Sequence, residues 1–565
     1  MVNNVKNNLK NELKIYLSQI NNSVGDIEFN KKLIIDNACK ASEENCDLII
    51  FPEMTICGYP CEDLWKNKHF VKSCEDAITS IIQYSKQITT AILIGSPITD
   101  ISKGKQVIRN SVLLIENGQV KNIIHKKTLP NYSVFDEERY FSSSSALSYV
   151  EFRGQTLAIL ICEDFWQKKN WLLINEQICD NILVVNSSPF TIDKHKQRID
   201  HAIEFCKTTK KSLIYVNQIG GQDSLVFDGG SFIINNFGEL KLQMNNFEED
   251  NAIITLAKDS TILIEKNLVN NSLNFTENKI EQIYLAMVLG LRDYLKKNNF
   301  SKVIIGMSGG IDSALVATIA VDAIGCKNVK LYGLPTRFNS LESHNDAKSC
   351  ASNLQAELKI IEIEEIFKKM LEILDNNYEQ TSSLAQENLQ SRIRGNILMS
   401  ISNSSNALLL STGNKSELAC GYATIYGDMC GAFNPIKDLY KTQIYEIVKF
   451  RNANISKLSL LKKINLIPEN IISKAPSAEL RFNQKDSDSL PDYEILDQIL
   501  VNLIEQEKSV NDLEKQGFDK DLVLRINRLL LHSEYKRNQA TIGVKLSTMS
   551  FDKERRYPIT NKFFQ

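Results

Sequence analysis

The sequence contains no long apolar run and no recognisable targeting segment. No stretch approaches the ~18 apolar residues that a membrane-spanning helix needs. The segment from Met1 to Asn11 is polar and rich in Asn and Lys, unlike the apolar core of a secretory signal. We therefore expect a cytoplasmic protein with no membrane partner.

The residue patterns of metal clusters are also missing. The 12 cysteines include no Cys-x-x-Cys pair, and the histidines form no ligand cluster. Cys57 and Cys61 are close in sequence, but packing explains them better than half of a zinc site does. This pattern indicates reduced thiols and no prosthetic group.

A strong charge of either sign is lacking as well. The net charge of −2 at pH 7 argues against a nucleic-acid partner held by a basic surface. The hydrophobic fraction of 43% is sufficient for well-packed cores, and a length of 565 residues predicts two or more domains. The chain is therefore expected to be globular and multidomain.

The first part of the chain predicts α/β layers with mixed sheets. Amphipathic stretches predict helices at Glu28–Asn45 and Lys196–Lys211. Asn117-Gly118 predicts one hairpin, and a second is expected between Ser231 and Leu256, around Phe237-Gly238. The predicted strands are Leu13–Ile20, Asp47–Phe51, Ala91–Gly95, Val112–Ile115, Val120–Ile124, Leu157–Ile161, Ile182–Asn186 and Leu213–Asn217.

A polar, Asn-rich stretch, Thr261–Lys279, is expected to be a linker between a domain at residues 12–260 and a domain at residues 280–565. After it the pattern changes to helix, strand, glycine loop, helix and strand. Strands are predicted at Lys302–Met307, Val329–Leu334 and Ala407–Leu410. This order is typical of a doubly wound parallel sheet, whose ligands bind at the carboxyl ends of the strands.

The run Ser308–Ser313 (SGGIDS) lies between a predicted strand and a predicted helix, Ala314–Ile324. Such a turn points backbone N–H groups and a helix N-terminus at one spot, where a phosphate binds well. No Gly-Lys-Ser or Gly-Lys-Thr follows, so the run is not a Walker A loop. It resembles the pyrophosphate loop of ATP pyrophosphatases, which implies that the protein adenylates a carbonyl compound.

Two other interpretations of this run remain open. Gly-Gly after a strand is common as plain turn chemistry. Gly306, Ser308 and Gly310 also fit the Gly-x-Ser-x-Gly elbow of hydrolases. That elbow needs a downstream acid and histidine, and the downstream histidines, His344 and His532, are not in a pattern that suggests a triad.

Three predicted strands of the first domain end next to reactive side chains, Glu53, Lys126 and Cys162. Covalent amide hydrolysis requires these groups: the carboxylate takes the thiol proton, the thiolate attacks, and the cation stabilises the oxyanion. Taken singly, each residue has a simpler interpretation: Glu53 could cap a helix, Lys126 could be solvated, and Cys162 could be a small buried apolar residue.

The order Glu, Lys, Cys resembles the nitrilase superfamily. Three flanking stretches resemble the glutaminase domain of glutamine-dependent NAD synthetases: residues 51–63 (FPEMTICGYPCED), 129–141 (LPNYSVFDEERYF) and 216–231 (VNQIGGQDSLVFDGGS). The resemblance implies that Glu53 is the general base, Lys126 the oxyanion stabiliser and Cys162 the nucleophile. It also implies glutamine contacts at Tyr132, Ser188 and Lys194.

Segments of the second domain resemble the NAD synthetase domain, namely residues 388–394 (NLQSRIR), 413–426 (GNKSELACGYATIY) and 476–491. The resemblance extends from about residue 13 to Asn561. It implies ATP binding at Gly306, Met307, Ser308, Gly309, Gly310, Ile311, Asp312, Ser313 and Thr412. It implies deamido-NAD contacts at Asn388, Glu417, Tyr422, Ala423, Thr424, Ile425 and Lys536.

Mg²⁺ bound with ATP is the expected cofactor. Asp312 and Glu417 supply two carboxylates able to hold this ion against the phosphates. Without the neighbouring motif, Glu417 would be interpreted as a helix N-terminal cap. The turn-rich stretch Pro476–Pro491 is interpreted as an exposed loop or as a lid that closes on the phosphates.

Together the resemblances imply an α/β protein with an N-terminal nitrilase-like α-β-β-α sandwich and a C-terminal doubly wound parallel sheet of the adenine nucleotide α-hydrolase-like kind. The implied reaction converts deamido-NAD, ATP, L-glutamine and water to NAD, AMP, diphosphate and L-glutamate, with ammonia delivered internally to an adenylate. The alternative is another glutamine amidotransferase with an ATP-pyrophosphatase domain and a different carboxylate acceptor. Members of the family assemble, so a homo-oligomer that acts on small molecules is expected.

Overall fold

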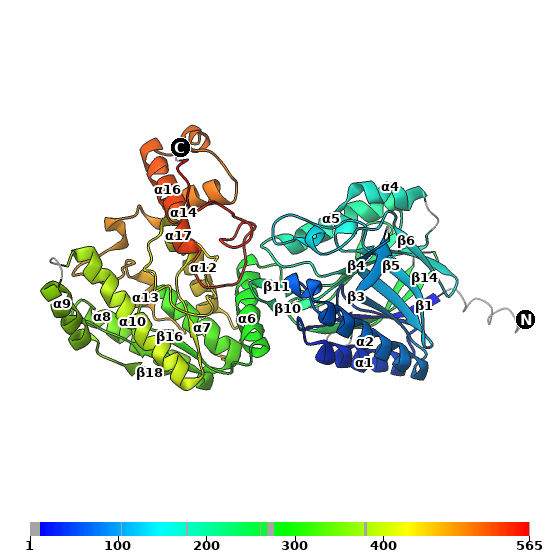
Figure 1. The fold of residues 1–565 in the computed structure, drawn as a ribbon, viewed down its shortest axis with the longest axis horizontal. Helices are drawn as coiled ribbons and strands as arrows, with labels where there is room; N and C mark the ends of the chain where they lie inside the picture. Colours follow the sequence, from blue (N-terminus) through cyan, green and yellow to red (C-terminus); the bar gives the residue numbers. More distant parts are fainter. Residues whose placement is uncertain are drawn as a thin grey trace, which may run out of the picture. The chain divides into compact units, whose positions relative to one another are not determined.

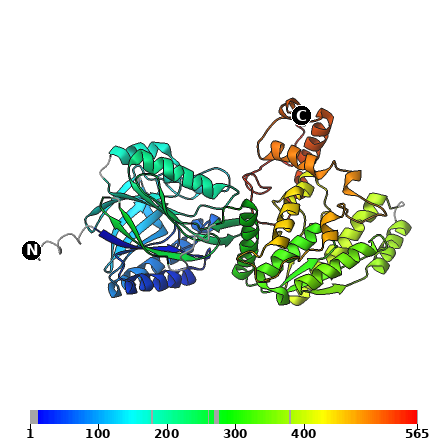
Figure 2. The ribbon, with the colours of Figure 1, turned by 180° about the vertical axis from the view of Figure 1, so that it is seen from behind.

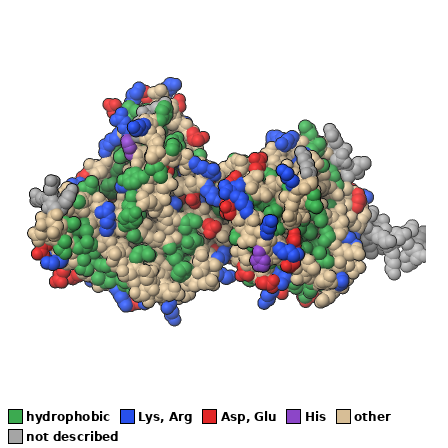
Figure 3. Space-filling model, in the orientation of Figure 1, with side chains coloured by type: hydrophobic (Ala, Val, Ile, Leu, Met, Phe, Trp, Pro, Cys, Tyr) green, Lys and Arg blue, Asp and Glu red, His purple; other side chains and the backbone are tan. Residues whose placement is uncertain are grey.

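A computed structural model of the chain describes residues 12–102, 104–176, 179–259, 261–267, 276–377 and 381–563. The chain divides into two compact units, one extending to Gln222 and including Val226–Glu277, the other made of Asp223–Leu225 and the chain from Asn278 onward. Figure 3 shows side chains of both charge signs on the visible face of each unit, in keeping with the small net charge. Over the described ranges, no helix has the length and apolar character needed to cross a membrane.

The first unit contains two large sheets. In the seven-stranded sheet β1, β2 and β3 are parallel neighbours, and antiparallel strands extend it on both sides. Its order is β15 (Ile262–Asn267), β14 (Asp250–Ala257), β1 (Glu12–Gln19), β2 (Leu48–Ile50), β3 (Ala91–Ser102), β4 (Lys105–Glu116) and β5 (Gln119–His125).

The six-stranded sheet has a parallel centre, formed by β7, β8 and β9, and antiparallel edges. Its order is β13 (Leu240–Gln243), β12 (Phe232–Ile234), β9 (Ser212–Asn217), β8 (Asn181–Asn186), β7 (Gln155–Ile161) and β6 (Ser148–Phe152). Two short strands, β10 (Ile219–Gln222) and β11 (Leu225–Asp228), follow β9.

The two sheets of the first unit share one apolar core. Alternate residues of a strand point to the same face, so Ile15 and Leu17 of β1 join Leu157 and Ile159 of β7 in a single buried cluster. Helices cover the outer faces, with α1 and α2 on one side and α4 and α5 on the other (Figures 1 and 2). Their bounds are α1 Ile27–Glu43, α2 Lys68–Tyr84, α3 Glu163–Trp166, α4 Lys168–Glu176 and α5 Lys194–Thr209. This is the predicted α-β-β-α sandwich.

The second unit is built on a four-stranded parallel sheet. Its order is β18 (Glu357–Ile360), β17 (Val329–Gly333), β16 (Val303–Gly306) and β19 (Leu408–Leu410), so the chain starts near the centre, moves to one edge and returns to the other. That order defines the predicted doubly wound topology, with its switch point between β16 and β19.

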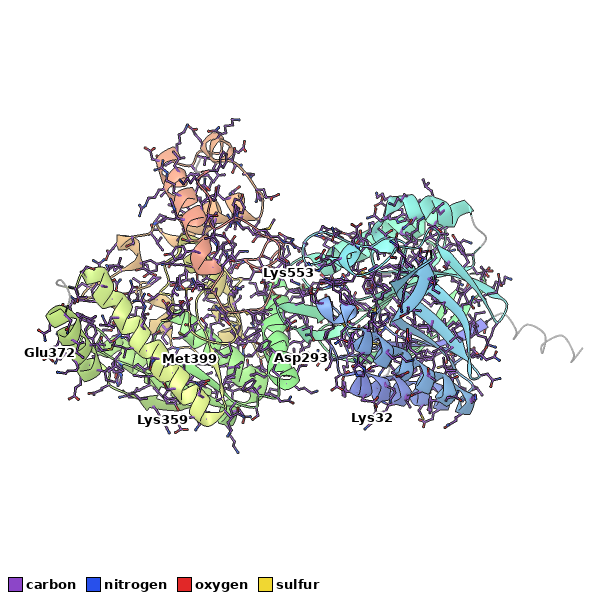
Figure 4. The ribbon with its side chains drawn as sticks, in the orientation of Figure 1. Lys32, Asp293, Lys359, Glu372, Met399 and Lys553 are labelled. Carbon is purple, nitrogen blue, oxygen red and sulfur yellow. The ribbon has the colours of Figure 1, made fainter. Side chains whose placement is uncertain are left out.

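Helices connect and cover this sheet. Figure 4 marks Glu372 on α9 and Met399 on α10, two helices that pack together, and apolar residues of both join one face of the sheet in a buried cluster. A second cluster forms from α14 and α16 near the C-terminus. The bounds are α6 Lys279–Lys297, α7 Ile311–Ile324, α8 Leu341–Leu354, α9 Glu364–Asn377, α10 Ser383–Ser405, α11 Lys415–Cys420, α12 Lys441–Ala453, α13 Glu469–Ser473, α14 Tyr493–Ile504, α15 Val510–Lys515, α16 Lys520–His532 and α17 Glu534–Arg537.

The structure corrects two details of the sequence-based prediction. Of the second predicted hairpin, only β12 and β13 pair with each other. The remaining strand of that stretch, β14, pairs with β1 in the other sheet. The start of the predicted linker is strand β15, since the apolar run at Ile262 allows pairing with β14. Residues 268–275 of that linker lie outside the described residues.

Replacing Ile15 with Ala should destabilise the first unit, because Ile15 is fully buried between the two sheets. Removing its side chain leaves a cavity, and such changes typically cost about 2–5 kcal/mol. Urea unfolding followed by tryptophan fluorescence measures the loss. Ile123→Ala is the matched control, since that side chain is 46% exposed on β5. Equal effects of the two substitutions would contradict the sandwich packing.

Candidate active sites

The three predicted catalytic residues of the first unit follow three different strands. Glu53 comes after β2, Lys126 directly after β5 and Cys162 directly after β7. β2 and β5 run in the same direction, so their carboxyl ends lie at the same edge of the seven-stranded sheet. All three side chains are buried, and Lys126 Nζ lies 2.8 Å from Glu53 Oε1. The predicted set is therefore brought together.

Glu53 is held by hydrogen bonds from both sheets. Its Oε1 accepts from Asn110 Nδ2 at 2.7 Å as well as from Lys126. Its Oε2 accepts from the backbone N–H of Ser187 at 3.0 Å, immediately after β8. A carboxylate fixed in this way keeps one orientation, which a general base requires.

Glu137 is a fourth ionisable residue of this site, and the sequence analysis did not assign it a role. Its Oε1 accepts from Lys126 Nζ at 2.8 Å and from the Tyr59 hydroxyl at 2.8 Å. Burial raises the pKa of Glu137 to about 7. It lies within the stretch 129–141 that carries the resemblance, but its two acidic neighbours, Asp136 and Glu138, hide which of the three is buried.

Lys126 therefore lies between two carboxylates. Burial alone lowers the pKa of Lys126, but Glu137 and Glu53 outweigh it and raise that pKa well above its ordinary value. The side chain is an ammonium ion, which can stabilise an oxyanion.

Cys162 stands on a sharp turn between β7 and α3. Its backbone has φ 46° and ψ −98°, and its N–H donates to Val185 O at 2.9 Å. Burial raises the pKa of the Cys162 thiol well above its ordinary value, Glu53 adds to this, and Lys126 opposes it. The thiol is therefore protonated at neutral pH, and it would need a base to become a nucleophile.

The predicted glutamine contacts lie around this turn. Tyr132 donates its hydroxyl to Glu163 Oε2 at 2.8 Å, next to Cys162 in the chain. Ser188 follows β8, which pairs in parallel with β7, so it lies at the same sheet edge as Cys162, and its Oγ accepts from Arg198 Nε at 3.2 Å. The Lys194 ammonium lies 4.1 Å from the centre of the Trp166 ring. Trp166 is the last residue of α3, the short helix whose N-cap is Cys162.

In the second unit, the glycine loop joins β16 to α7 as predicted. Gly309 has φ 83°, and a Cβ there would lie 2.2 Å from the carbonyl oxygen of Ser343. Ser308 Oγ accepts from Gly310 N at 3.1 Å and lies 3.1 Å from Ser313 Oγ. Ser308 thus braces the turn, and among the described residues its hydroxyl has no hydrogen bond to a histidine, so the hydrolase-elbow interpretation finds no support.

A cavity of about 510 Å³ opens at this end of the sheet. Its lining includes every predicted ATP contact, from Gly306 to Ser313 together with Thr412, and also Glu417, Tyr422 and Ala423. The other predicted deamido-NAD contacts lie beside the lining. Thr424 donates to Asn388 Oδ1 at 2.8 Å, Lys536 donates to Ala423 O at 2.7 Å, and Ile425 O accepts from Arg392. These residues brace the 421–425 segment.

Two carboxylates and a lysine meet in the cavity. Lys441 forms ion pairs with Asp312 and, at 3.7 Å, with Glu417. Glu417 is also part of a capping box with Asn414, so both interpretations of this residue apply. Burial, and next the charge of Asp312, raise the pKa of Glu417 to about 8, while Lys441 opposes the shift. Lys441, the first residue of α12, was not identified from the sequence.

This donor set fits Mg²⁺. Mg²⁺ is usually held by one or two carboxylates together with substrate phosphates. Asp312 and Glu417 are such a pair, and Asp486 adds a buried Oδ1 without a hydrogen-bond partner in the cavity lining. Across the described residues, no group of three or more His, Cys, Asp or Glu forms a complete metal site by itself.

The stretch Pro476–Pro491 lies against this cavity. Glu479 Oε1 accepts from the hydroxyls of Ser343 at 2.6 Å and Ser340 at 2.9 Å, at the N-terminus of α8. Lys474 adds an ion pair to the same carboxylate at 3.2 Å. Residues 476–480 and Asp486 line the cavity, so the segment covers the nucleotide site as a lid would.

Comparison with known proteins agrees with the division into two domains. Residues 14–264 match the carbon-nitrogen hydrolase family, and residues 283–540 match the NAD synthase family. The chain is 39% identical to the glutamine-dependent NAD(+) synthetase of Aquifex aeolicus, over 98% of this chain and 100% of that protein. It is 40% identical to the enzyme of the same name from Acinetobacter baylyi, over 97% and 98% of the two chains.

A solved structure agrees as well. The glutamine-dependent NAD+ synthetase from Acinetobacter baumannii, determined in complex with adenosine diphosphate, superposes with a TM-score of 0.76 at 36% identity, covering 97% of this chain and 99% of that one.

The fold and the two sites define an enzyme that joins a carbon-nitrogen hydrolase domain to an NAD synthase domain. The chain belongs to the glutamine-dependent NAD(+) synthetases, which are ATP-dependent ligases with a glutaminase domain. The predicted family, fold class and enzyme class are confirmed.

Gly309→Ala should weaken ATP binding by tenfold or more. The new Cβ would lie 2.2 Å from Ser343 O in a backbone conformation with φ 83°, so the loop must move. Gly310→Ala is the comparison, because Gly310 has φ −93° and its nearest contact, Ser308 Oγ, lies at 3.3 Å. ATP titration by calorimetry should show a much smaller loss for Gly310→Ala. Equal losses would contradict this account of the loop.

Proposed function

We propose that this chain converts deamido-NAD, ATP, L-glutamine and water to NAD, AMP, diphosphate and L-glutamate, with the two half-reactions assigned to particular residues. A glutaminase domain at residues 12–260 releases ammonia, and a synthetase domain at residues 280–565 adenylates deamido-NAD. The observation that supports this most is the position of the Lys126 ammonium. It lies 2.8 Å from both Glu53 and Glu137, and Cys162 is close enough to affect its pKa.

In the first half-reaction Cys162 is the nucleophile. Glu53 takes the thiol proton as the sulfur attacks the side-chain carbonyl of glutamine, and Lys126 stabilises the resulting oxyanion. The proton passes to the leaving nitrogen, ammonia departs, and water hydrolyses the thioester to glutamate. Tyr132, Ser188 and Lys194, which lie around the Cys162 turn, hold the glutamine.

In the second half-reaction the glycine loop binds ATP. The carboxylate of deamido-NAD attacks the α-phosphate, diphosphate leaves, and the mixed anhydride has AMP as a good leaving group. Ammonia then displaces AMP and forms the amide. Because ammonium is not a nucleophile and predominates at neutral pH, ammonia released at Cys162 is used best when it reaches the adenylate directly.

Asp312 and Glu417 would hold Mg²⁺ at this site. The ion supplies charge neutralisation on the phosphates. Lys441 lies between the same carboxylates and adds a fixed positive charge beside the loop. The residues proposed to bind deamido-NAD directly, or to brace the 421–425 segment that binds it, are Asn388, Glu417, Tyr422, Ala423, Thr424, Ile425 and Lys536.

We further propose that the protein works in the cytoplasm as a homo-oligomer. All 12 cysteines are free thiols, which suits a reducing compartment. Assembly is a property that the family resemblance implies.

A turnover assay tests the overall reaction. The purified protein, given deamido-NAD, ATP with Mg²⁺ and glutamine, should form NAD and AMP in equal amounts. If the folded protein forms no NAD in this mixture, deamido-NAD is not its acceptor and the proposed reaction is wrong.

Cys162→Ala should abolish synthesis from glutamine while synthesis from added ammonia continues at a rate within about twofold of wild type. The thiol is needed only to release ammonia, and the adenylating site belongs to the other unit. NAD formation is measured with each nitrogen source. If both activities disappear while the unfolding transition is unchanged, the assignment of two independent sites fails.

Binding of Mg²⁺ with ATP should depend on pH. Glu417, with its pKa of about 8, holds a proton below that pH, and the ion must displace it. The apparent affinity should fall by up to tenfold per pH unit as the pH drops from 8 to 6, with proton release measurable by calorimetry in two buffers. Glu417→Gln should weaken binding and remove the pH dependence. If the unmodified protein releases no protons when Mg²⁺ and ATP bind, Glu417 is excluded as a ligand of the ion.

A further inference from the structure

One buried carboxylate links the backbones of two catalytic residues in the glutaminase unit. Asp164 lies two positions after Cys162 and is 2% exposed. Its Oδ1 accepts from the backbone N–H groups of Thr128 at 2.7 Å and Lys127 at 3.1 Å. Its Oδ2 accepts from the N–H of Ile161 at 3.3 Å. A single side chain therefore bonds to the residue before Cys162 and to the two residues after Lys126.

The two segments that Asp164 joins come from different sheets. Lys126 follows β5 of the seven-stranded sheet, and Cys162 follows β7 of the six-stranded sheet. From its own sheet the Lys126 backbone is restrained by its N–H, which donates to Asn110 O at 2.8 Å, and its ammonium is held by Glu53 at 2.8 Å. β-ladder pairing cannot set a distance between strands of two sheets. The hydrogen bonds of Asp164 can set this distance, because they connect the end of β5 to the end of β7.

Asn170 braces the same junction. Its Nδ2 donates to the carbonyl oxygen of Asp164 at 2.9 Å and lies 3.5 Å from Thr128 Oγ1. Asn170 is itself fully buried, so the junction is packed on both sides of Asp164. Burial raises the pKa of Asp164 to about 6, and the Thr128 N–H and then the charge of Lys126 oppose the shift.

We propose that Asp164 is a positioning residue of the glutaminase site, which fixes the Lys126 ammonium at the place where the oxyanion of the Cys162 adduct forms. The inference rests on the roles proposed for Lys126 and Cys162. The hydrogen bonds of Asp164 come from backbone N–H groups. Asp164 acts through the backbone of Lys127 and Thr128, and an error of about 1 Å in such a position costs on the order of 100-fold in rate.

Asp164→Asn tests the proposal with little change in volume. An amide keeps one acceptor oxygen, enough for the short bond from Thr128, but its NH₂ group cannot accept from Ile161. We expect kcat for glutamine hydrolysis to fall 10- to 100-fold with KM within twofold of wild type, and NAD synthesis from ammonia to be unchanged.

Alkylation separates positioning of Lys126 from damage to the thiol. Iodoacetamide reacts with Cys162 without forming an oxyanion, so its rate, followed by mass spectrometry of the Cys162 peptide, should stay within twofold of wild type in Asp164→Asn. Asp250→Asn is the matched control, because Asp250 is fully buried and accepts backbone N–H bonds from Asn245 and Asn251. It should leave kcat for glutamine within twofold.

A kcat for Asp164→Asn within threefold of wild type, or an alkylation rate that falls in step with kcat, would overturn the inference. Should this variant not fold, Asn170→Ala decides: a threefold or larger loss of kcat at constant KM supports the proposal, and an unchanged kcat refutes it. Failure of the proposed function looks different, because Cys162→Ala would then still make NAD from glutamine. Wild-type behaviour of Asp164→Asn beside an inactive Cys162→Ala refutes only the role of Asp164.

Discussion

The glutaminase site depends on the buried ammonium of Lys126 and the two carboxylates that neutralise it. An ion removed from water is stable only when opposite charges and hydrogen bonds replace its hydration. Glu53 and Glu137 each lie 2.8 Å from Lys126 Nζ. Two acids therefore share one base in this cluster, and in the mechanism proposed above Glu53 is the acid residue that takes the proton of the nearby thiol.

This requirement explains much of the surrounding architecture. Glu53 and Lys126 come from strand ends of one sheet, while Ser187 and Cys162 come from the ends of β8 and β7 in the other. The Ser187 N–H bonds to Glu53, so the charged cluster connects the two layers of the sandwich. The apolar core between the sheets brings these strand ends together, and the polar contacts set their orientation.

The cavity of the second unit repeats this arrangement of one buried lysine and two carboxylates. Here a single lysine, Lys441, pairs with Asp312 and Glu417, and Asp486 lies nearby in the lining. Burial, and next the charge of Asp312, raise the pKa of Glu417 to about 8. Such a pocket is prepared for a cation, as a glycine loop at a helix N-terminus is prepared for phosphate.

The sequence by itself determined the strands, the glycine loop and the reactive residues, because each leaves a local pattern. Apolar runs of the right length predicted β7, β8 and β9, and Ser308–Ser313 predicted the turn into α7. Only the tertiary structure decided which charged residues are buried together. Glu137, Asp164 and Lys441 are ordinary charged residues in the sequence, and their roles arise from strand ends and turns that meet after folding. The pairing of β14 with β1 is of the same kind, since an apolar strand carries no mark of which sheet it joins.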